Sequence, residues 1–329
     1  MSGNPDPEDN RSHIEGEVFH AGERAVQTLF GVRSRVAENG ARAIRPFITE
    51  QQGAFLGGLR YVLIGTHDLA GSLWPTVLFG APGFIVPIGP ASLEIRTGLD
   101  RGDPAVAELV PGRFLGVLGI DLAERRRVRM NGRLVEGGDD VIRVEVDQAF
   151  NNCPQYIWPR CLPHLQQSAP ISLPSKPKSL EFVDAEIGRI IRGADTFFIA
   201  SRHSGDAEPR FNGVDISHRG GRPGFLEICD NTIVWPEYTG NSYFNTLGNL
   251  LFDASCGLLV PDFENGRLLQ LSGRAEILWP SPLGSEPRED GPQINCRVRF
   301  RPSEIFLRTN ALAGAWRLLG RAQFKAGQL

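Results

Sequence analysis

Long stretches of this sequence return 141 residues later. The pentapeptide GAPGF at 80–84 returns as GRPGF at 221–225, and the segment 115–133 returns without a gap as 256–274. The positions that pair in this register are Gly116/Gly257, Leu118/Leu259, Asp121/Asp262, Arg126/Arg267, Gly132/Gly273 and Arg133/Arg274. The units of a solenoid are only about 20 to 50 residues long. The chain is therefore predicted to hold two copies of one domain.

The register between the two copies changes once. The segment 61–66 (YVLIGT) matches 196–201 (TFFIAS) at a spacing of 135, so the second copy has six additional residues before Gly221. They lie beside the polar run DISHRGG at 215–221, where the first copy has the apolar run WPTVLFG at 74–80. Duplication followed by divergence of one copy is the simplest explanation.

Short apolar runs, separated by Gly, Pro, Asp and Asn, predict a mainly β fold with flanking helices. The expected strands are 62–64, 84–86, 115–120 and 141–146 in the first copy, and 197–200, 224–228, 232–235, 257–260, 268–271 and 275–279 in the second. This spacing indicates an antiparallel β-barrel with hairpin connections. Gly132 and Gly273 are expected at bends or bulges, where a strand must curve to close a barrel.

Other segments frame the two copies. Apolar residues at three- and four-residue spacing over 25–36 predict a helix that stops near Gly40. The run 162–179 contains four prolines and no strong periodicity, which is typical of a linker. The expected boundaries are a polar tail and helical segment at 1–50, a first repeat at 51–161, the linker at 162–179, a second repeat at 180–312 and a tail at 313–329.

Composition narrows the class of protein. A net charge of −3 argues against a general binder of nucleic acid or of anionic membranes. No apolar run approaches the roughly 18 residues of a membrane span, and the N-terminus is polar rather than signal-like, so we expect a cytoplasmic protein. The five cysteines form no CxxC pair, so neither a disulfide framework nor a metal site is expected.

Several motifs together resemble the pyridoxamine 5'-phosphate oxidase-like family of FMN-binding split β-barrels. They are FHAGERAVQ at 19–27, GAPGF at 80–84, LGIDLAERRRVRMNGR at 118–133, DQAFNNCPQYI at 147–157, DISHRGGRPGF at 215–225, FNTLGNLL at 244–251 and DFENGRLLQLSGRAEILW at 262–279. Simpler members of that family pair two chains, with the flavin at the seam between two barrels. The resemblance implies that the two tandem split barrels here form this pseudo-dimer within one chain.

The polar run of the second copy is the candidate phosphate cradle. Ser217 can donate a hydroxyl, Arg219 can grip a phosphate through two charge-assisted bonds, and Gly220 lets the backbone approach closely. His218 is the one candidate for a catalytic group, through stacking, hydrogen bonding or proton transfer beside a flavin. The alternative is a solvated loop with a partly exposed histidine.

A helix start is expected next to this run. Asn241 and Ser242 are predicted caps, with Asn245, Thr246 and Asn249 in the opening turns of the helix. Unpaired N–H groups and the positive end of the helix dipole favour a phosphate there. The alternative is a helix that is capped by its own side chains.

The corresponding stretch of the first copy is acidic. Asp100, Asp103 and Glu108 would repel a phosphate. We therefore expect one flavin per chain, bound mainly through the second copy.

Three further residues are candidates for contact with the flavin ring. The resemblance places Arg267 and Gln270 near the ring edge, where a donor would stabilise the reduced flavin. Because their spacing gives them opposite parity along a strand, both cannot face the ring without a bulge, and Gln270 is favoured. Trp235 either covers the ring or packs the barrel core.

These observations lead to the hypothesis of an FMN-dependent oxidoreductase that acts on an unidentified small molecule. A separate flavin or ferredoxin-type reductase could supply electrons, and two chains could associate as a homodimer. The resemblance implies that pyridoxamine phosphate oxidation would need a C-terminal segment with arginine and histidine to hold the substrate phosphate. That activity is not expected here, because no histidine follows His218. FMN is favoured over FAD, since no dinucleotide-binding glycine motif is present, while a deazaflavin stays open. The alternatives are a non-catalytic flavin or haem protein, with His218 or His203 as axial ligand, and an assembly role.

Overall fold

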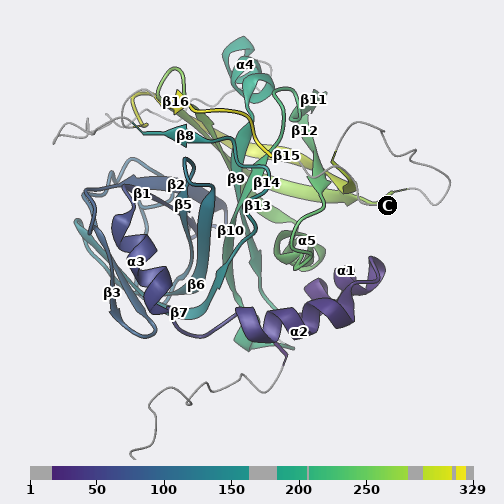
Figure 1. The fold of residues 1–329 in the computed structure, drawn as a ribbon. Coiled ribbons are helices and arrows are strands. Elements are labelled where there is room, and N and C mark those ends of the chain that lie inside the picture. Colours follow the sequence, from purple (N-terminus) through teal and green to yellow (C-terminus); the bar gives the residue numbers. More distant parts are fainter. Residues whose placement is uncertain (1–16, 163–183, 206, 281–291, 313–315, 324–329) are drawn as a thin grey trace, which may run out of the picture.

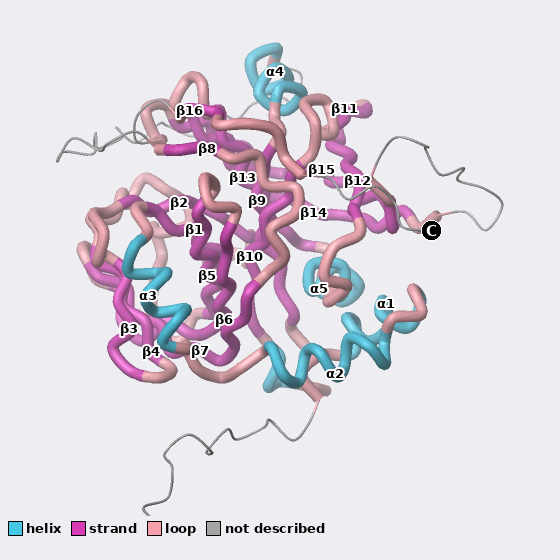
Figure 2. Tube along the Cα trace, in the orientation of Figure 1, coloured by secondary structure: helices cyan, strands magenta, loops and turns pink. Residues whose placement is uncertain are grey.

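A computed structural model describes residues 17–162, 184–205, 207–280, 292–312 and 316–323 (Figure 1). Nearly all of the predicted linker at 162–179 lies outside the described residues. Strands dominate the fold, and a few short helices lie around them (Figure 2). No helix in the described ranges is long and apolar enough to span a membrane.

Each copy of the repeat forms one antiparallel sheet of seven strands. The first sheet has the order β2-β1-β5-β6-β7-β4-β3, with β1 Tyr61–His67, β2 Leu73–Phe79, β3 Ile85–Gly89, β4 Ser92–Arg96, β5 Phe114–Asp121, β6 Arg126–Gly137 and β7 Val141–Asn151. The second has the order β10-β9-β13-β14-β15-β12-β11, with β9 Thr196–His203, β10 Gly213–Gly220, β11 Glu227–Cys229, β12 Thr232–Tyr238, β13 Ser255–Asp262, β14 Arg267–Leu278 and β15 Ile294–Arg308. The two orders match strand for strand. The duplication read from the sequence is therefore a duplication of the fold.

The fold is mainly β and barrel-like in both repeats, as expected, but the sheets are open and the expected closure of each barrel is not found in the described part of the chain. Among the described residues, the edge strands β2 and β3 do not pair with each other, nor do β10 and β11. The reason is that the edge strands β2 and β10 pack on the other repeat: β2 lies against β13 and β14, and β10 lies against β5 and β6. One edge of each sheet is thus covered by the neighbouring sheet instead of by its own.

Two glycines of the repeat allow this close packing. A side chain at Gly116 would come within 2.7 Å of the carbonyl oxygen of Val214, and one at Gly257 within 2.1 Å of that of Leu73. These glycines occupy equivalent positions, on β5 and β13. The paired conservation of glycine within the chain therefore has a direct cause, because both sheets need backbone contact at equivalent points.

The predicted bulges at Gly132 and Gly273 are confirmed. The register of β6 against β7 shifts between Asn131 and Gly132, and that of β14 against β15 shifts between Ser272 and Gly273. A side chain at either glycine would lie about 2 Å from a carbonyl oxygen of the adjacent strand. Bulging therefore bends the long strands without closing the sheets.

Three predictions about local structure need correction. The alternative interpretation of DISHRGG as a solvated loop was wrong, because 215–220 lies in strand β10. The segments 268–271 and 275–279 belong to one strand, β14. The strands β2, β4, β6 and β15 were not among the expected strands.

The predicted N-terminal helix is two helices, α1 Ala21–Leu29 and α2 Arg33–Ala43. The helix is interrupted at Gly31, whose φ of +66° lies in the left-handed region that glycine adopts readily. The predicted stop at Gly40 was wrong, because this glycine lies inside α2, where a side chain would meet the ring of Phe19 at 2.4 Å. Close packing explains this glycine.

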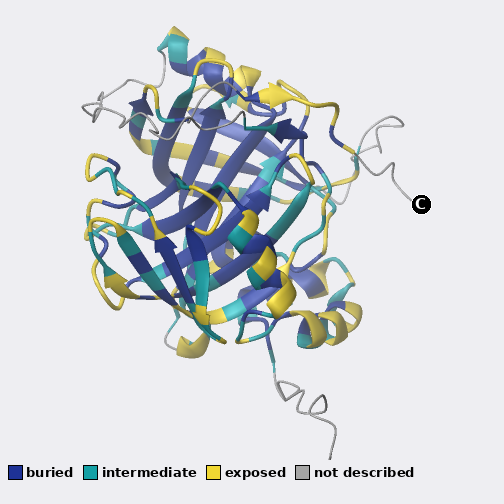
Figure 3. Cartoon of the chain, turned by 60° about the vertical axis from the view of Figure 1, so that its left-hand side comes forward, coloured by how far each residue is buried: buried dark blue, intermediate teal, exposed yellow. Residues whose placement is uncertain are grey.

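The remaining helices are short and lie at the outside of the sheets. They are α3 Glu50–Gly58, α4 Ala185–Gly193, α5 Asn245–Phe252 and the 3₁₀ turn η1 Pro209–Phe211. A two-stranded ribbon of β8 Arg160–Cys161 and β16 Arg317–Leu318 completes the structure. The interior strands are the most deeply buried parts of the molecule, whereas the helices expose one side (Figure 3).

Candidate functional site

A cleft opens where β6 of the first repeat faces β10 and α5 of the second. Its polar lining includes Arg127 and Arg129 from β6, Ser217, His218 and Arg219 from β10, Glu237 from β12, and Asn245 and Thr246 from α5; we call it the arginine cleft. Its volume is about 110 Å³. One water needs about 10 to 15 Å³, so a group the size of a phosphate has room.

Arg127 gives the cleft its uncompensated charge. Its guanidinium donates to the carbonyl oxygen of Cys153 and to Nδ1 of His218, at 3.1 Å for the latter. No carboxylate within the described ranges pairs with it. Burial, and then the nearby charges of Arg129 and Arg219, lower the pKa of Arg127 to about 9. An anion in the cleft would relieve this repulsion.

His218 lines the cleft and, within the described residues, holds an unpartnered donor. Because arginine has no acceptor, Nδ1 of His218 must accept from Arg127, which leaves the proton on Nε2. This Nε2 is buried and has no partner among the described groups. Burial, followed by Arg127 and Arg219, lowers the pKa of His218 well below its ordinary value. The residue is thus a neutral, buried N–H donor rather than an exposed loop histidine.

Arg129 joins the two repeats inside the cleft. It donates to Ser217 Oγ, to Asn245 Oδ1 at 2.9 Å and to Asp215 Oδ1 at 3.4 Å. Ser217 Oγ in turn lies 3.2 Å from Thr246 Oγ1. The predicted residues Ser217, Asn245 and Thr246 are therefore brought together, around an arginine from the other copy.

The start of α5 faces the cleft without a side-chain cap. Phe244 is the N-cap, with a left-handed φ of 60°, and no side chain described here accepts from the first turn. The prediction of Asn241 and Ser242 as caps was wrong, because the chain turns between them and the helix. Asn241 instead accepts from the backbone of Tyr243. Free N–H groups at the start of α5 add to the attraction for an anion.

Arg219 and Trp235 are both tied to Glu237. The Nε of Arg219 lies 2.8 and 3.1 Å from the two carboxylate oxygens of Glu237, and the indole nitrogen of Trp235 donates to the same group at 2.9 Å. Trp235 is fully buried and packs edge to face on Phe197 in the core of the second repeat. Of the two, only Arg219 reaches the cleft, with Gly220 beside it, and its charge is largely balanced.

The structure places Arg267 and Gln270 away from the arginine cleft. Arg267 stands at the β13–β14 turn and forms ion pairs with Asp262 and Glu186. Gln270 is completely buried and donates to Asp103 Oδ1 at 2.9 Å and to the carbonyl oxygen of Pro75 at 3.0 Å. The parity argument separated the two residues correctly, but neither lines the cleft.

Gln270 lies at the equivalent seam on the other side of the molecule. The repeat aligns it with Arg129, and aligns Thr76 with Ser217. There, Thr76 donates to Asp103, and Arg308 pairs with Asp103 at 2.5 Å and with Asp100 at 2.7 Å. At this seam, ion pairs within the chain thus fill the site that is equivalent to the arginine cleft.

Sequence reasoning missed the two β6 arginines. Residues 127 and 129 share one face of a strand, since alternate side chains point to the same side. At the equivalent positions of the second copy stand Leu268 and Gln270. This difference between the copies was the available signal, but only the facing of the two sheets shows that first-repeat residues complete a second-repeat site.

A second cavity, of about 250 Å³, lies farther along the same seam. His203 lines it, stacks on His20 with ring centroids 4.0 Å apart, and has neither ring nitrogen partnered in the described structure. Asn249 lines this second cavity and not the arginine cleft, and it bonds to His20, Ser201 and Asp215. His203, a candidate haem ligand by sequence, is therefore separate from the arginine cleft.

No family model and no curated protein matches this chain. Among solved structures, it is similar to a HupZ variant from Group A Streptococcus, at 15% identity, covering 38% of this chain and 98% of that one, with a TM-score of 0.28. A protein assigned as a pyridoxamine 5'-phosphate oxidase from Lactobacillus delbrueckii matches at 17% identity, 32% and 95% coverage and a TM-score of 0.24. A second protein with this assignment, from Corynebacterium glutamicum, matches at 17% identity. The match covers 43% of this chain and 98% of that one, with a TM-score of 0.27. TM-scores this low carry no weight for function.

Proposed function

We propose that this chain binds FMN, with the phosphate in the arginine cleft, and serves as a flavin-dependent oxidoreductase for a small molecule. One observation carries the proposal: Arg127 is a desolvated cation without a carboxylate partner in the described structure, next to the unpaired Nε2–H of His218 and the uncapped start of α5. All three features lack an anionic acceptor. The resemblance of the motifs supports FMN as the molecule that supplies it.

The residues of the cleft fit a phosphate in number and kind. Arg127 and the N–H of His218 would donate to it directly, and the backbone of the first turn of α5 would face it. Arg129 would hold Ser217 and α5 in place around it. Bound FMN supplies the hydride or electron transfer, while the chain positions it and sets the local charge. A separate reductase would deliver electrons in this proposal.

The first test is an absorption spectrum of the purified protein with and without added FMN, followed by titration of an Arg127→Ala variant. We expect flavin bands in the wild type, and an FMN affinity lowered roughly 10- to 100-fold in the variant, because a charge-assisted bond is lost. Arg299→Ala is the matched control, since Arg299 is half-exposed and pairs with Glu276, and neither residue lines the cleft. It should bind as the wild type does.

Absence of flavin uptake by the wild type would refute the proposal. A Soret band on addition of haem would instead support the haem-binding alternative. His218 is poorly arranged for that role, because its Nε2 carries a proton while Nδ1 accepts from Arg127. Coordination through Nε2 would require this hydrogen bond to break.

A further inference from the structure

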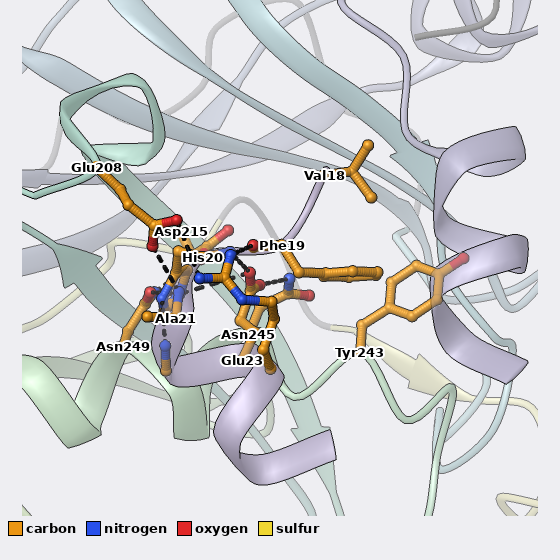
Figure 4. A network of polar contacts seen from close by, with 12 residues as sticks. Val18, Phe19, His20, Ala21, Glu23, Glu208, Asp215, Tyr243, Asn245 and Asn249 are labelled. Atoms are coloured by element: carbon orange, nitrogen blue, oxygen red, sulfur yellow. Dashed lines mark hydrogen bonds and ion pairs between the residues drawn. The ribbon is translucent and has the colours of Figure 1, made fainter. Parts of the chain in front are cut away.

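The motif FHAGERAVQ lies outside both repeats, yet two of its polar side chains are among the most buried in the protein. His20 is 4% exposed and Glu23 is 5% exposed. Both belong to the start of α1, and both reach α5 (Figure 4). The capping box of α1, in which His20 and Glu23 bond to each other's backbone, explains their local contacts but not their contacts with α5.

The proton position on His20 follows from its hydrogen bonds. Its Nδ1 accepts from the backbone N–H of Gly22 at 3.2 Å, so Nε2 carries the proton and donates to Asn249 Oδ1 at 3.0 Å. This bond fixes which way the amide of Asn249 points. The amide nitrogen then donates to Asp215 Oδ2 at 2.7 Å.

Glu23 fixes a second amide in the same way. Its Oε2 accepts from the backbone N–H of His20 at 2.8 Å, and its Oε1 accepts from the side-chain nitrogen of Asn245. The oxygen of Asn245 is thereby turned to accept from Arg129. If this amide were flipped, its N–H groups would face the guanidinium, and the bond would be lost.

The contacts close into a ring of six residues. In order, they are His20, Asn249, Asp215, Arg129, Asn245 and Glu23. The ring joins α1, α5, β10 and β6, and therefore connects the N-terminal segment with both repeats. Only Arg129 of the six also bonds to Ser217 in the arginine cleft.

We propose that His20 and Glu23 are positioning residues of the arginine cleft: by orienting the amides of Asn249 and Asn245, they hold Arg129 and the start of α5 in the arrangement that receives an anion. The inference rests on the proposed FMN phosphate site. Neither residue lines that cleft, so both act through others. In consequence, the N-terminal segment is part of the binding machinery and not only a support for it.

His20→Asn tests the link to Asn249. Asparagine is a good N-cap and keeps the local bond to α1, but it is too short to reach Asn249. We expect roughly tenfold weaker binding of inorganic phosphate and of FMN by calorimetry, with little change in Tm. The effects of His20→Asn and Asn249→Ala should be non-additive, because both break the same bond.

Glu23→Ala tests the link to Asn245, with Gln52→Ala as its matched control. Gln52 completes the capping box of α3 with Thr49, as Glu23 does for α1, and its side chain touches neither the ring nor the cleft. Both variants should lose some stability. Only Glu23→Ala should also lose affinity for phosphate, again roughly tenfold.

Each outcome decides a different question. If the wild type binds phosphate but not FMN, the proposed function fails, and the phosphate titrations of the variants still judge the ring. If His20→Asn and Glu23→Ala bind phosphate as tightly as the wild type, the inference is overturned while FMN binding stands. Additive losses of phosphate affinity in the double variant His20→Asn/Asn249→Ala would overturn the inference as well. If Glu23→Ala does not fold, His20→Asn decides. Binding of neither ligand by the wild type refutes both proposals.

Discussion

At the scale of single residues, buried donors and acceptors are more informative than the motif in which they lie. His218 was picked out by its place in DISHRGG, but its role depends on Arg127, 91 residues away. That one bond sets the proton on Nε2 and leaves a buried donor unused. Burying a polar group without a partner costs about 1 to 3 kcal/mol. A ligand that accepts a hydrogen bond from this N–H would recover that cost.

Glu23 leads to a prediction about pH. Burial and the charge of Asp215 raise its pKa from 4.5 to about 8. Between these two pH values the folded protein keeps a proton that the unfolded chain releases, so the free energy of unfolding falls as pH rises and levels off above 8. Glu23→Gln cannot titrate. We expect the stability of the wild type, relative to this variant, to decrease from pH 5 to pH 8.

Denaturant midpoints of both proteins over that range measure the effect. Burial lowers the pKa of His20 to about 4. Because His20 titrates in both proteins, its contribution cancels when the two are compared. Parallel pH profiles would contradict the prediction and show that Glu23 is ionised in the folded protein at neutral pH.

At the scale of elements, the main surprise is β10. Its side chains alternate as strands require, with Asp215, Ser217 and Arg219 on one face and Ile216 and His218 on the other. Both faces are largely buried, because the strand lies between its own sheet and the facing one. A strand whose polar residues are buried at such a seam has the composition of a loop, and the sequence pattern misleads for this reason.

The backbone contact between the sheets leads to a prediction about Gly257. A methyl group there would lie 2.1 Å from the carbonyl oxygen of Leu73, which belongs to the facing sheet. Gly257→Ala should lower the free energy of unfolding by about 1 to 3 kcal/mol, as overpacking does. Gly138→Ala is the control, because a methyl group at Gly138 would meet its nearest neighbour, the carbonyl oxygen of Val141, only at 3.7 Å. Equal stability of the two variants would mean that β13 and β2 are not packed this closely.

At the scale of the whole molecule, duplication has produced two equivalent seams between the repeats, and the two now differ in what fills them. One carries the arginine cleft, whereas the other is filled by Asp103 and its bonds to Thr76, Gln270 and Arg308. Residues from both repeats contribute at each seam. A change in either copy therefore affects both seams, and divergence of the two copies is what makes the seams unequal.

This asymmetry predicts one ligand per chain. Calorimetric titration with FMN should give a stoichiometry of one, because Arg308 and Asp103 satisfy each other at the second seam. Arg127→Ala should lower the affinity without exposing a second class of sites. A stoichiometry of two would show that the ion pairs at the second seam open to admit a ligand.

The sequence alone determined the duplication, the strand-rich class, the bulges at Gly132 and Gly273, and the acidic character of Asp100 and Asp103. All of these follow from spacing and local chemistry, which are read along the chain. Only the tertiary structure decided that the sheets stay open and that Arg129 meets Asn245, or His20 meets Asn249. Those partners are 116 and 229 residues apart. No local pattern encodes such pairs, because they depend on how two sheets and an N-terminal helix pack against one another.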